Sequence, residues 1–223
     1  MLRSLYVMLD YHLAATDGEL GRVYDFLFDD ESWVVHYLVA ETASPTGKRK
    51  ALVLPFVVGQ PDWQMRRLPV LLTSEQIRTG PPLESNLPIS RQRKSGLKRP
   101  GSHLRSLREI LGYRIYTTDG AAGIIEDFIV DATLWGVHHV VVTLNQHPRR
   151  SILLPPESIR SISWTGKAAW VNMSLHELEK NRDFNPATPV NRDEEHRLYD
   201  YYGRPIFPLP PFASEERSEA KQH

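Results

Sequence analysis

Apolar and polar residues alternate with a period of two along several stretches of the chain, a pattern typical of β-strands. The clearest case runs from residue 21 to residue 28, and both of its predicted faces are largely apolar. We therefore expect a curved strand that is covered on both sides. The alternation places Val23, Asp25 and Leu27 on one face and Tyr24, Phe26 and Phe28 on the other.

Turn signals divide the chain between such stretches. Thr16-Asp17-Gly18 predicts a tight hairpin turn, because Gly readily adopts the positive φ that such turns require. Asp29 to Ser32 and Ala43 to Lys50 are the next predicted turns. A capped helix is expected to begin at Thr73. The strands expected between these signals are Tyr11 to Ala15, Trp33 to Glu41, Ala51 to Val58 and Leu68 to Leu72.

The chain contains this pattern twice. Residues 16–39 match residues 118–141 at a constant offset of 102, and about ten of the 24 positions are identical. The match continues upstream, where Leu2-Arg3-Ser4-Leu5 reappears as Leu104-Arg105-Ser106-Leu107. Downstream, Leu52-Val53-Leu54-Pro55 is aligned with Ile152-Leu153-Leu154-Pro155. A period of about a hundred residues is too long for a solenoid, so we interpret the repeat as a duplicated small domain.

The repeat predicts the domain organisation. We expect a first domain over residues 1–85, a basic Pro- and Gly-containing linker over 86–102, a second domain over 103–197 and a Tyr- and Pro-rich, partly disordered tail over 198–223. Small antiparallel sheets protect their edges by closing. The predicted fold class is therefore mainly β: two tandem small antiparallel β-barrels, each followed by a short α-helix.

Composition excludes several classes of protein. The 27 basic and 27 acidic residues cancel, so net charge indicates no nucleic-acid or membrane-surface partner for the whole chain. The absence of cysteine excludes disulfides, thiolate metal sites and cysteine nucleophiles and favours a cytoplasmic location. The longest apolar run, Trp33 to Ala40, is too short to span a bilayer, and residue 1 is expected at the start of a folded domain.

The residues shared by the two copies are expected to shape turns and strands. The acidic ones suggest a hard-cation site, but their spacing matches no known calcium loop. His36 and His138 recur as well, with His139 and His147 nearby, and we interpret them as ordinary strand residues. The motif residues are Asp17, Gly18, Gly21, Asp25, Phe26, Asp29 and Trp33 in the first copy, and Asp119, Gly120, Gly123, Asp127, Phe128, Asp131 and Trp135 in the second.

No dinucleotide fingerprint, phosphate loop, nucleophile elbow or zinc-protease pair occurs in the sequence. We therefore predict no catalytic residue, no cofactor and no metal site. The candidate partner-binding residues lie instead in the basic linker and the aromatic tail. They are Arg91, Arg93, Lys94, Lys98 and Arg99, with Tyr199, Tyr201 and Tyr202.

The TDGxxGxxxDFxxD stretch, the Trp-led strand after it and the aliphatic-Pro strand end resemble the PRC-barrel family over residues 5–205. The tandem arrangement ending in Tyr201-Tyr202-Gly203-Arg204-Pro205 is similar to bacterial two-barrel members. The resemblance implies a barrel like the cytoplasmic domain of the photosynthetic reaction centre H subunit, or the C-terminal domain of a ribosome maturation factor. Both of these relatives are binding modules without an active site.

Three hypotheses for function follow. The first is a non-enzymatic adaptor that binds protein partners, peripheral to a membrane or electron-transfer complex, with a homodimer as a further option. The second is an RNA- or ribosome-associated factor using the basic segment from Arg91 to Arg99, continued by Arg105 and Arg108. The third is a sensor of a small ligand or metal. The two repeats are also expected to pack against each other through a pseudo-symmetric apolar face.

Overall fold

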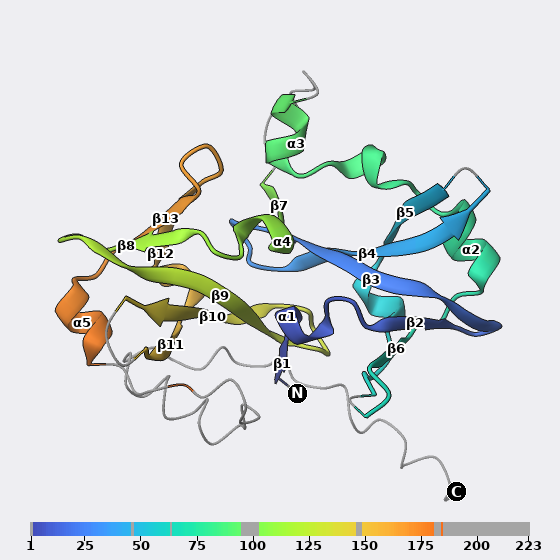
Figure 1. The fold of residues 1–223 in the computed structure, drawn as a ribbon, viewed down its shortest axis with the longest axis horizontal. Helices are drawn as coiled ribbons and strands as arrows, with labels where there is room; N and C mark the ends of the chain where they lie inside the picture. The colour runs from blue at the N-terminus through green and yellow to red at the C-terminus, as the bar shows by residue number, and fades with distance from the viewer. Residues whose placement is uncertain are drawn as a thin grey trace, which may run out of the picture. The chain divides into compact units, whose positions relative to one another are not determined.

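The computed structural model describes residues 2–45, 47–62, 64–94, 103–145, 149–180 and 184. Within these ranges the protein is mainly β, with two sheets and short helices at their connections (Figure 1). This confirms the predicted fold class. Each sheet follows an open path, so closure into a barrel is not detected among the described residues.

The first repeat supplies five strands in the order β5-β4-β3-β2-β6. All neighbours run antiparallel except β2 and β6, which are parallel. The predicted turn at Thr16-Asp17-Gly18 joins β2 to β3, and Gly18 there has a φ of +139°. The strands are β2 (His12–Ala15), β3 (Gly18–Asp29), β4 (Val35–Ser44), β5 (Gly47–Val53) and β6 (Arg67–Pro69).

The second repeat builds an equivalent sheet, in the order β11-β10-β9-β8-β13-β12. Its strand β12 has no counterpart among the named strands of the first repeat. The parallel pair recurs, here between β8 and β13. The strands are β8 (Arg114–Tyr116), β9 (Ala121–Asp131), β10 (Val137–Leu144), β11 (Ser151–Leu154), β12 (Ile159–Ser163) and β13 (Ala168–Val171).

The two repeats exchange their first strands. Strand β1 (Leu2–Ser4) pairs with β9 of the second repeat, and β7 (Leu104–Ser106) pairs with β3 of the first (Figure 1). The registers are equivalent: Leu2 faces Asp131, and Leu104 faces Asp29. Each sheet therefore contains one strand from the other half of the chain.

Short helices follow the exchanged strands and end each repeat. Ser4 and Ser106 cap the helices after β1 and β7, and Thr73 and Ser174 form capping boxes at the terminal ones. The helices are α1 (Leu5–Met8), α2 (Ser74–Thr79), α3 (Ile89–Lys94), α4 (Leu107–Ile110) and α5 (Leu175–Glu179), with 3₁₀ turns η1 (Pro55–Val57), η2 (Leu83–Asn86) and η3 (Pro156–Ser158).

The alternation predicted for residues 21–28 is wrong at one point. A register shift between Val23 and Asp25 interrupts the β3–β4 ladder. A bulge of this kind adds one residue to a strand and reverses the facing of those beyond it. As a result Val23 shares the main core with Phe26 and Phe28, whereas Leu27 belongs to a separate cluster that Tyr24 packs against.

Three boundaries also differ from the sequence prediction. The β4 strand begins at Val35 because Trp33 adopts a left-handed conformation with φ of 56°. The β4–β5 turn is shorter than predicted, since β4 extends to Ser44 and β5 starts at Gly47, whose φ is +124°. The next strand ends at Val53, before a 3₁₀ turn that begins at Pro55, because Pro lacks the N–H that a sheet requires.

The downstream alignment of the repeats is wrong by one residue. Leu38 pairs with Val53, and its equivalent Val140 pairs with Leu154. The structural offset after the hairpins is therefore 101, and Pro55 corresponds to Pro156. Matched positions of the two repeats after the hairpins therefore differ by 101 residues.

The predicted linker contains structure. Ile89–Lys94 of that segment form α3, which sequence periodicity did not reveal. The residues just before it cover the outer face of the first sheet, where Leu83 and Leu87 pack with Leu27, Val39 and Leu52. The linker is therefore partly integrated into the first repeat.

One hydrophobic core includes buried residues of both repeats. Phe28 and Phe128 meet with ring centroids 5.1 Å apart, and Phe26 stacks on Trp135 at 6.0 Å. Met1–Pro189 form a single compact unit. The expectation of a shared apolar face thus agrees with the structure. No helix among the described residues is long and apolar enough to cross a membrane.

Candidate binding surface

The buried motif aspartates hold the strand exchange in place. Asp25 Oδ2 accepts a hydrogen bond from Ser106 Oγ at 2.5 Å, and its Oδ1 accepts from the backbone N–H groups of Phe26 and Arg108. These donors belong to β3 and to the exchanged segment β7–α4. Asp25 therefore ties the second repeat's first helix to the first repeat's sheet.

Asp127 repeats this arrangement in the other direction. Its Oδ1 accepts from the N–H groups of Tyr6 and Phe128 at 2.8 and 2.6 Å, and its Oδ2 accepts from Ser4 Oγ. Burial raises the pKa of Asp127 to about 6, against the opposing effect of these donors. Burial also raises the pKa of Asp25. The geometry assigns both carboxyls a structural role at the bulges.

The other motif aspartates bind loop and helix N–H groups. Asp17 Oδ1 accepts from the backbone N and Oγ of Ser74, so it joins the β2–β3 turn to the start of α2. Asp119 accepts in the same way from Leu175 N at α5. Asp29 closes its own turn through Ser32, and Asp131 does so through Thr133. Hydrogen bonds lower the pKa of Asp17 and of Asp119.

The motif tryptophans join the repeats. The N–H of Val35 donates to the Trp135 carbonyl at 2.8 Å, and the N–H of Val137 donates to the Trp33 carbonyl at 2.7 Å. Trp33 also stacks on Phe28 at 5.7 Å. Both rings pack in or against the common core, which leaves neither as an open platform for a base or ligand.

Gly21 and Gly123 permit a close approach of neighbouring strands. A Cβ at Gly21 would overlap the Glu41 carbonyl oxygen, and one at Gly123 would overlap that of Thr143. Gly120, like Gly18, has a positive φ. These glycines are explained by backbone geometry.

The histidines do not form a metal centre in the described part of the chain. His36 is exposed and His138 is half-buried, whereas the adjacent His139 is buried. No group of three or more His, Asp or Glu side chains in the described ranges could hold an ion. His147 lies outside the described residues.

The structure describes only some of the candidate basic residues of the linker. Arg91 lies at α3 and, together with Lys50, hydrogen-bonds to Tyr24, which lowers the pKa of the Tyr24 hydroxyl. Arg93 and Lys94 belong to the same helix, but their side chains are outside the description. The remaining candidates all lie outside the described residues: Lys98, Arg99, Tyr199, Tyr201 and Tyr202.

Two arginines that the RNA hypothesis included are engaged in contacts within the protein. Arg105 forms an ion pair with Asp30 at 2.5 Å, and both side chains are largely buried. Arg108 pairs with Asp10 at 2.9 Å and donates to the Tyr24 carbonyl. Their charges serve the junction between the repeats.

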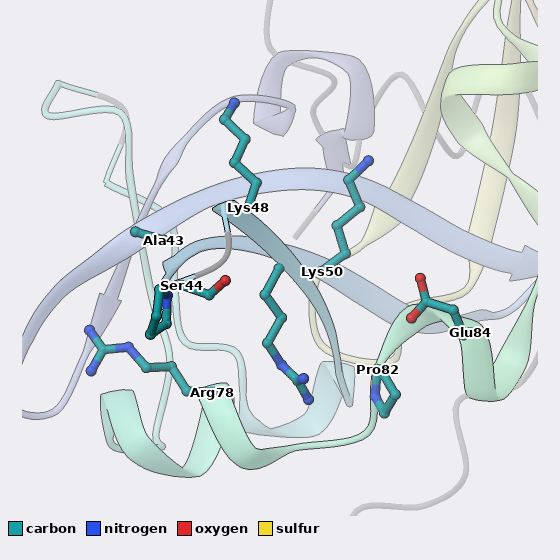
Figure 2. Close-up of a pocket in the computed structure, with 9 residues that line it drawn as sticks. Ala43, Ser44, Lys48, Lys50, Arg78, Pro82 and Glu84 are labelled. Atoms are coloured by element: carbon teal, nitrogen blue, oxygen red, sulfur yellow. The ribbon is translucent and has the colours of Figure 1, made fainter.

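A basic hollow that the sequence analysis missed lies beside the β4–β5 hairpin. Its volume is about 790 Å³, and four basic side chains and one acidic side chain line it. Figure 2 shows Lys48 and Lys50 projecting from the same side of β5, with Arg78 contributed by α2. The available signal was the run Lys48-Arg49-Lys50 in a predicted turn. The lining consists of Ala43, Ser44, Pro45, Lys48, Arg49, Lys50, Arg78, Pro82 and Glu84.

Few carboxylates offset these charges. Lys48 Nζ is 2.8 Å from Glu41, and the Lys48 side chain remains 72% exposed. Glu41 also lies in register with Arg22 and Lys50 on the adjacent strands, so a single carboxylate stands among three cations. Lys50 Nζ is 3.4 Å from the centre of the Tyr24 ring. Lys48, Lys50 and Arg78 are called the basic surface below.

The second repeat has different chemistry at the matched positions. Ser151 occupies the position of Lys50, and Glu179 that of Arg78, whereas Arg149 and Arg150, at the positions of Lys48 and Arg49, keep the charge. Glu126 replaces Tyr24 and accepts hydrogen bonds from Thr143 and Ser151. The second repeat therefore keeps two of the four basic side chains that line the hollow and lacks counterparts of Lys50 and Arg78.

Exposed apolar side chains show the same asymmetry. Phe56 is 76% exposed and Leu71 is 68% exposed. Their counterparts are the exposed polar residues Glu157 and Asn172. Leu54, also exposed, follows directly after β5. The first repeat thus combines basic and apolar exposed groups along β5 and η1.

Comparison with known proteins adds no identification. No family model matches the chain, and no curated protein matches it.

Proposed function

We propose that this chain is a non-enzymatic, tandem PRC-barrel-like adaptor that binds a protein partner through its first repeat. The observation that carries the proposal is the asymmetry between two copies of one scaffold. Along β5, η1 and α2, four basic or apolar residues of the first repeat, Lys50, Phe56, Leu71 and Arg78, are matched by the polar or acidic residues Ser151, Glu157, Asn172 and Glu179. Since the shared motif residues are occupied in turns, bulges and the core, the residues that differ are the better candidates for recognition.

The chemistry of the first repeat suits a protein partner. Protein interfaces combine apolar anchors with a polar rim and are enriched in aromatic side chains and Arg. Phe56 and Leu71 supply exposed apolar groups, and the basic surface supplies charge. The resemblance to PRC barrels, whose relatives are binding modules, supports the same proposal. It also suggests a partner in a membrane or electron-transfer complex.

The test is affinity capture from the host with the tagged full-length chain, using soluble and detergent-solubilised fractions with and without nuclease. Phe56→Ser/Leu71→Ser removes the exposed apolar groups, and Leu134→Ser removes an exposed apolar side chain from the second repeat. A captured protein should then bind the purified wild-type chain and Leu134→Ser alike, and bind the double variant much more weakly. Equal binding to all three chains would refute the assignment of the surface.

An RNA-binding function is the second candidate, favoured by the basic surface and by the location of Arg91 on α3 near Lys50. Phosphate binding requires such clustered charge and weakens steeply with salt. Capture of ribosomal proteins or RNA that is lost on nuclease treatment would favour it. Failure to bind RNA at low salt would remove it.

A further inference from the structure

We infer that the basic surface binds an extended acidic segment of a protein partner, which adds as a strand to the open edge of β5. This inference rests on the proposed function and specifies the partner's chemistry. It depends on the edge position of β5, on the direction of its backbone N–H groups, on the hollow beside it and on the charges around that hollow.

The edge of the first sheet is open along the first half of β5. Strand β5 is the last in its sheet. Leu52 N–H points away from β4, because it donates to the Pro81 carbonyl. By the alternation of a strand, the N–H groups of Lys50 and Lys48 point the same way. Within the described part of the chain, no backbone carbonyl accepts from either of them.

Space for a ligand exists at the same place. The hollow of about 790 Å³ lies between the β4–β5 hairpin, α2 and Pro82. Pro81 and Pro82 occupy the edge beyond Lys50, since Pro82 bridges Ala51. An added strand could therefore pair along only a few residues, from Gly47 to Lys50. Peptide recognition by strand addition commonly combines such backbone pairing with side-chain contacts.

The charges select an acidic segment. Lys48 and Lys50 project from one side of the edge strand, and Arg78 is exposed on α2, which lies toward the opposite side of that strand (Figure 2). Among the described residues, no carboxylate lies within ion-pairing distance of Lys50 or Arg78. Carboxylates on alternate residues of an extended peptide would have the spacing of Lys48 and Lys50. Edge lysines also discourage unspecific strand pairing, so a complementary charge pattern would give selectivity.

The geometry favours a peptide over a nucleic acid. Open backbone N–H groups on a strand edge match the carbonyls of an extended chain. The Tyr24 ring, the nearest aromatic group, is covered by Lys50 at 3.4 Å and so offers no free face on that side for stacking a base.

The experiment uses the full-length chain and a short synthetic peptide of alternating Glu and Val, with binding followed by fluorescence anisotropy and amide hydrogen exchange. We expect saturable binding, slower exchange at the Lys48 and Lys50 amides, and at least about tenfold weaker binding to Lys48→Glu/Lys50→Glu and to Arg78→Glu. Arg149→Glu, at the matched position of the second repeat, should bind like wild type. A peptide methylated on alternate backbone nitrogens tests the pairing and should bind at least about tenfold more weakly.

Several outcomes would overturn the inference. Equal binding of the methylated peptide would exclude strand addition, and equal loss with Arg149→Glu would indicate unspecific charge attraction. Binding of a single-stranded RNA oligonucleotide without binding of the peptide would assign the surface to nucleic acid. If the peptide fails to bind but a captured protein still depends on Phe56 and Leu71, then the inference fails while the proposed function stands.

Discussion

The buried carboxyl of Asp127 predicts an unusual dependence of stability on pH. Its pKa is raised to about 6 in the folded protein, mainly by burial and to a smaller extent by Glu126. The hydrogen bonds from Ser4, Tyr6 and Phe128 oppose this rise without cancelling it. An aspartate in the unfolded chain has a pKa of about 3.9. The folded state therefore binds a proton more tightly than the unfolded state.

The sign of the effect follows from this difference. Between pH 4 and pH 6 folding takes up a proton at Asp127, so its contribution to the free energy of unfolding is present at low pH and is lost as the pH rises through about 6. The rise from about 3.9 to about 6 corresponds to about 3 kcal/mol. Other groups titrate in this range, so the effect must be measured as a difference between variants.

Asp127→Asn is the appropriate variant because it removes the charge and keeps the hydrogen bonds. The amide oxygen can accept from the N–H groups of Tyr6 and Phe128, as Oδ1 does in the wild type. The amide nitrogen can donate to Ser4 Oγ, a hydroxyl that has two lone pairs. We expect the stability of Asp127→Asn relative to wild type to rise by about 2 kcal/mol between pH 4 and pH 7, because the unfolded carboxyl is already about half ionised at pH 4.

Urea unfolding followed by tryptophan fluorescence at four pH values between 4 and 7 provides the measurement. Asp119→Asn serves as a contrast: hydrogen bonds lower the pKa of Asp119, so its contribution changes mainly below pH 4, and the stability of this variant relative to wild type should stay nearly constant between pH 4 and pH 7. A difference between Asp127→Asn and wild type that stays constant with pH would refute the reasoning. It would show that the carboxyl has the same pKa in the folded and the unfolded state.

Three further predictions concern backbone geometry and the exchange. Gly21→Ala should destabilise the protein by about 3 kcal/mol, because the new methyl group overlaps a backbone carbonyl. Gly136→Ala has open space around the new methyl group and should change stability little. Equal melting temperatures of the two variants would contradict this prediction. Trp135→Ala should cost about 3–5 kcal/mol and lower the stability of both repeats together, which hydrogen exchange resolved by residue can check. Deleting residues 1–8 removes β1 and the buried side chains of Leu5 and Met8. The amides of β9 in the second repeat should then lose protection from hydrogen exchange. Unchanged protection of these amides would exclude the strand exchange.

Local chemistry determined much of what the sequence predicted. The repeat, the turn at Gly18, the capped helix after Thr73 and the mainly β class depend on residues close together in the chain. A glycine with positive φ or a capping side chain acts within a few residues. These features were therefore predictable without any knowledge of long-range contacts.

The basic surface was not predicted because it joins distant residues. Lys48 and Lys50 are adjacent in sequence to Arg49 and could be recognised as a basic run, but Arg78 comes from α2. The difference between the repeats becomes apparent only when Lys50 is matched to Ser151 and Arg78 to Glu179. That match requires the strand register. The sequence alignment alone was one residue out of register.

The strand exchange was decided by tertiary structure alone. Leu2-Arg3-Ser4-Leu5 and Leu104-Arg105-Ser106-Leu107 are identical tetrapeptides, so each has the same local preference for either sheet. The bulge at Asp25 likewise could not be predicted from the alternation of apolar and polar residues. The Asp25 carboxylate there accepts hydrogen bonds from Ser106 and Arg108 of the other repeat. The sequence by itself determined the two copies, their strands and their turns. Only long-range hydrogen bonding and burial of the common core decided which strand joins which sheet.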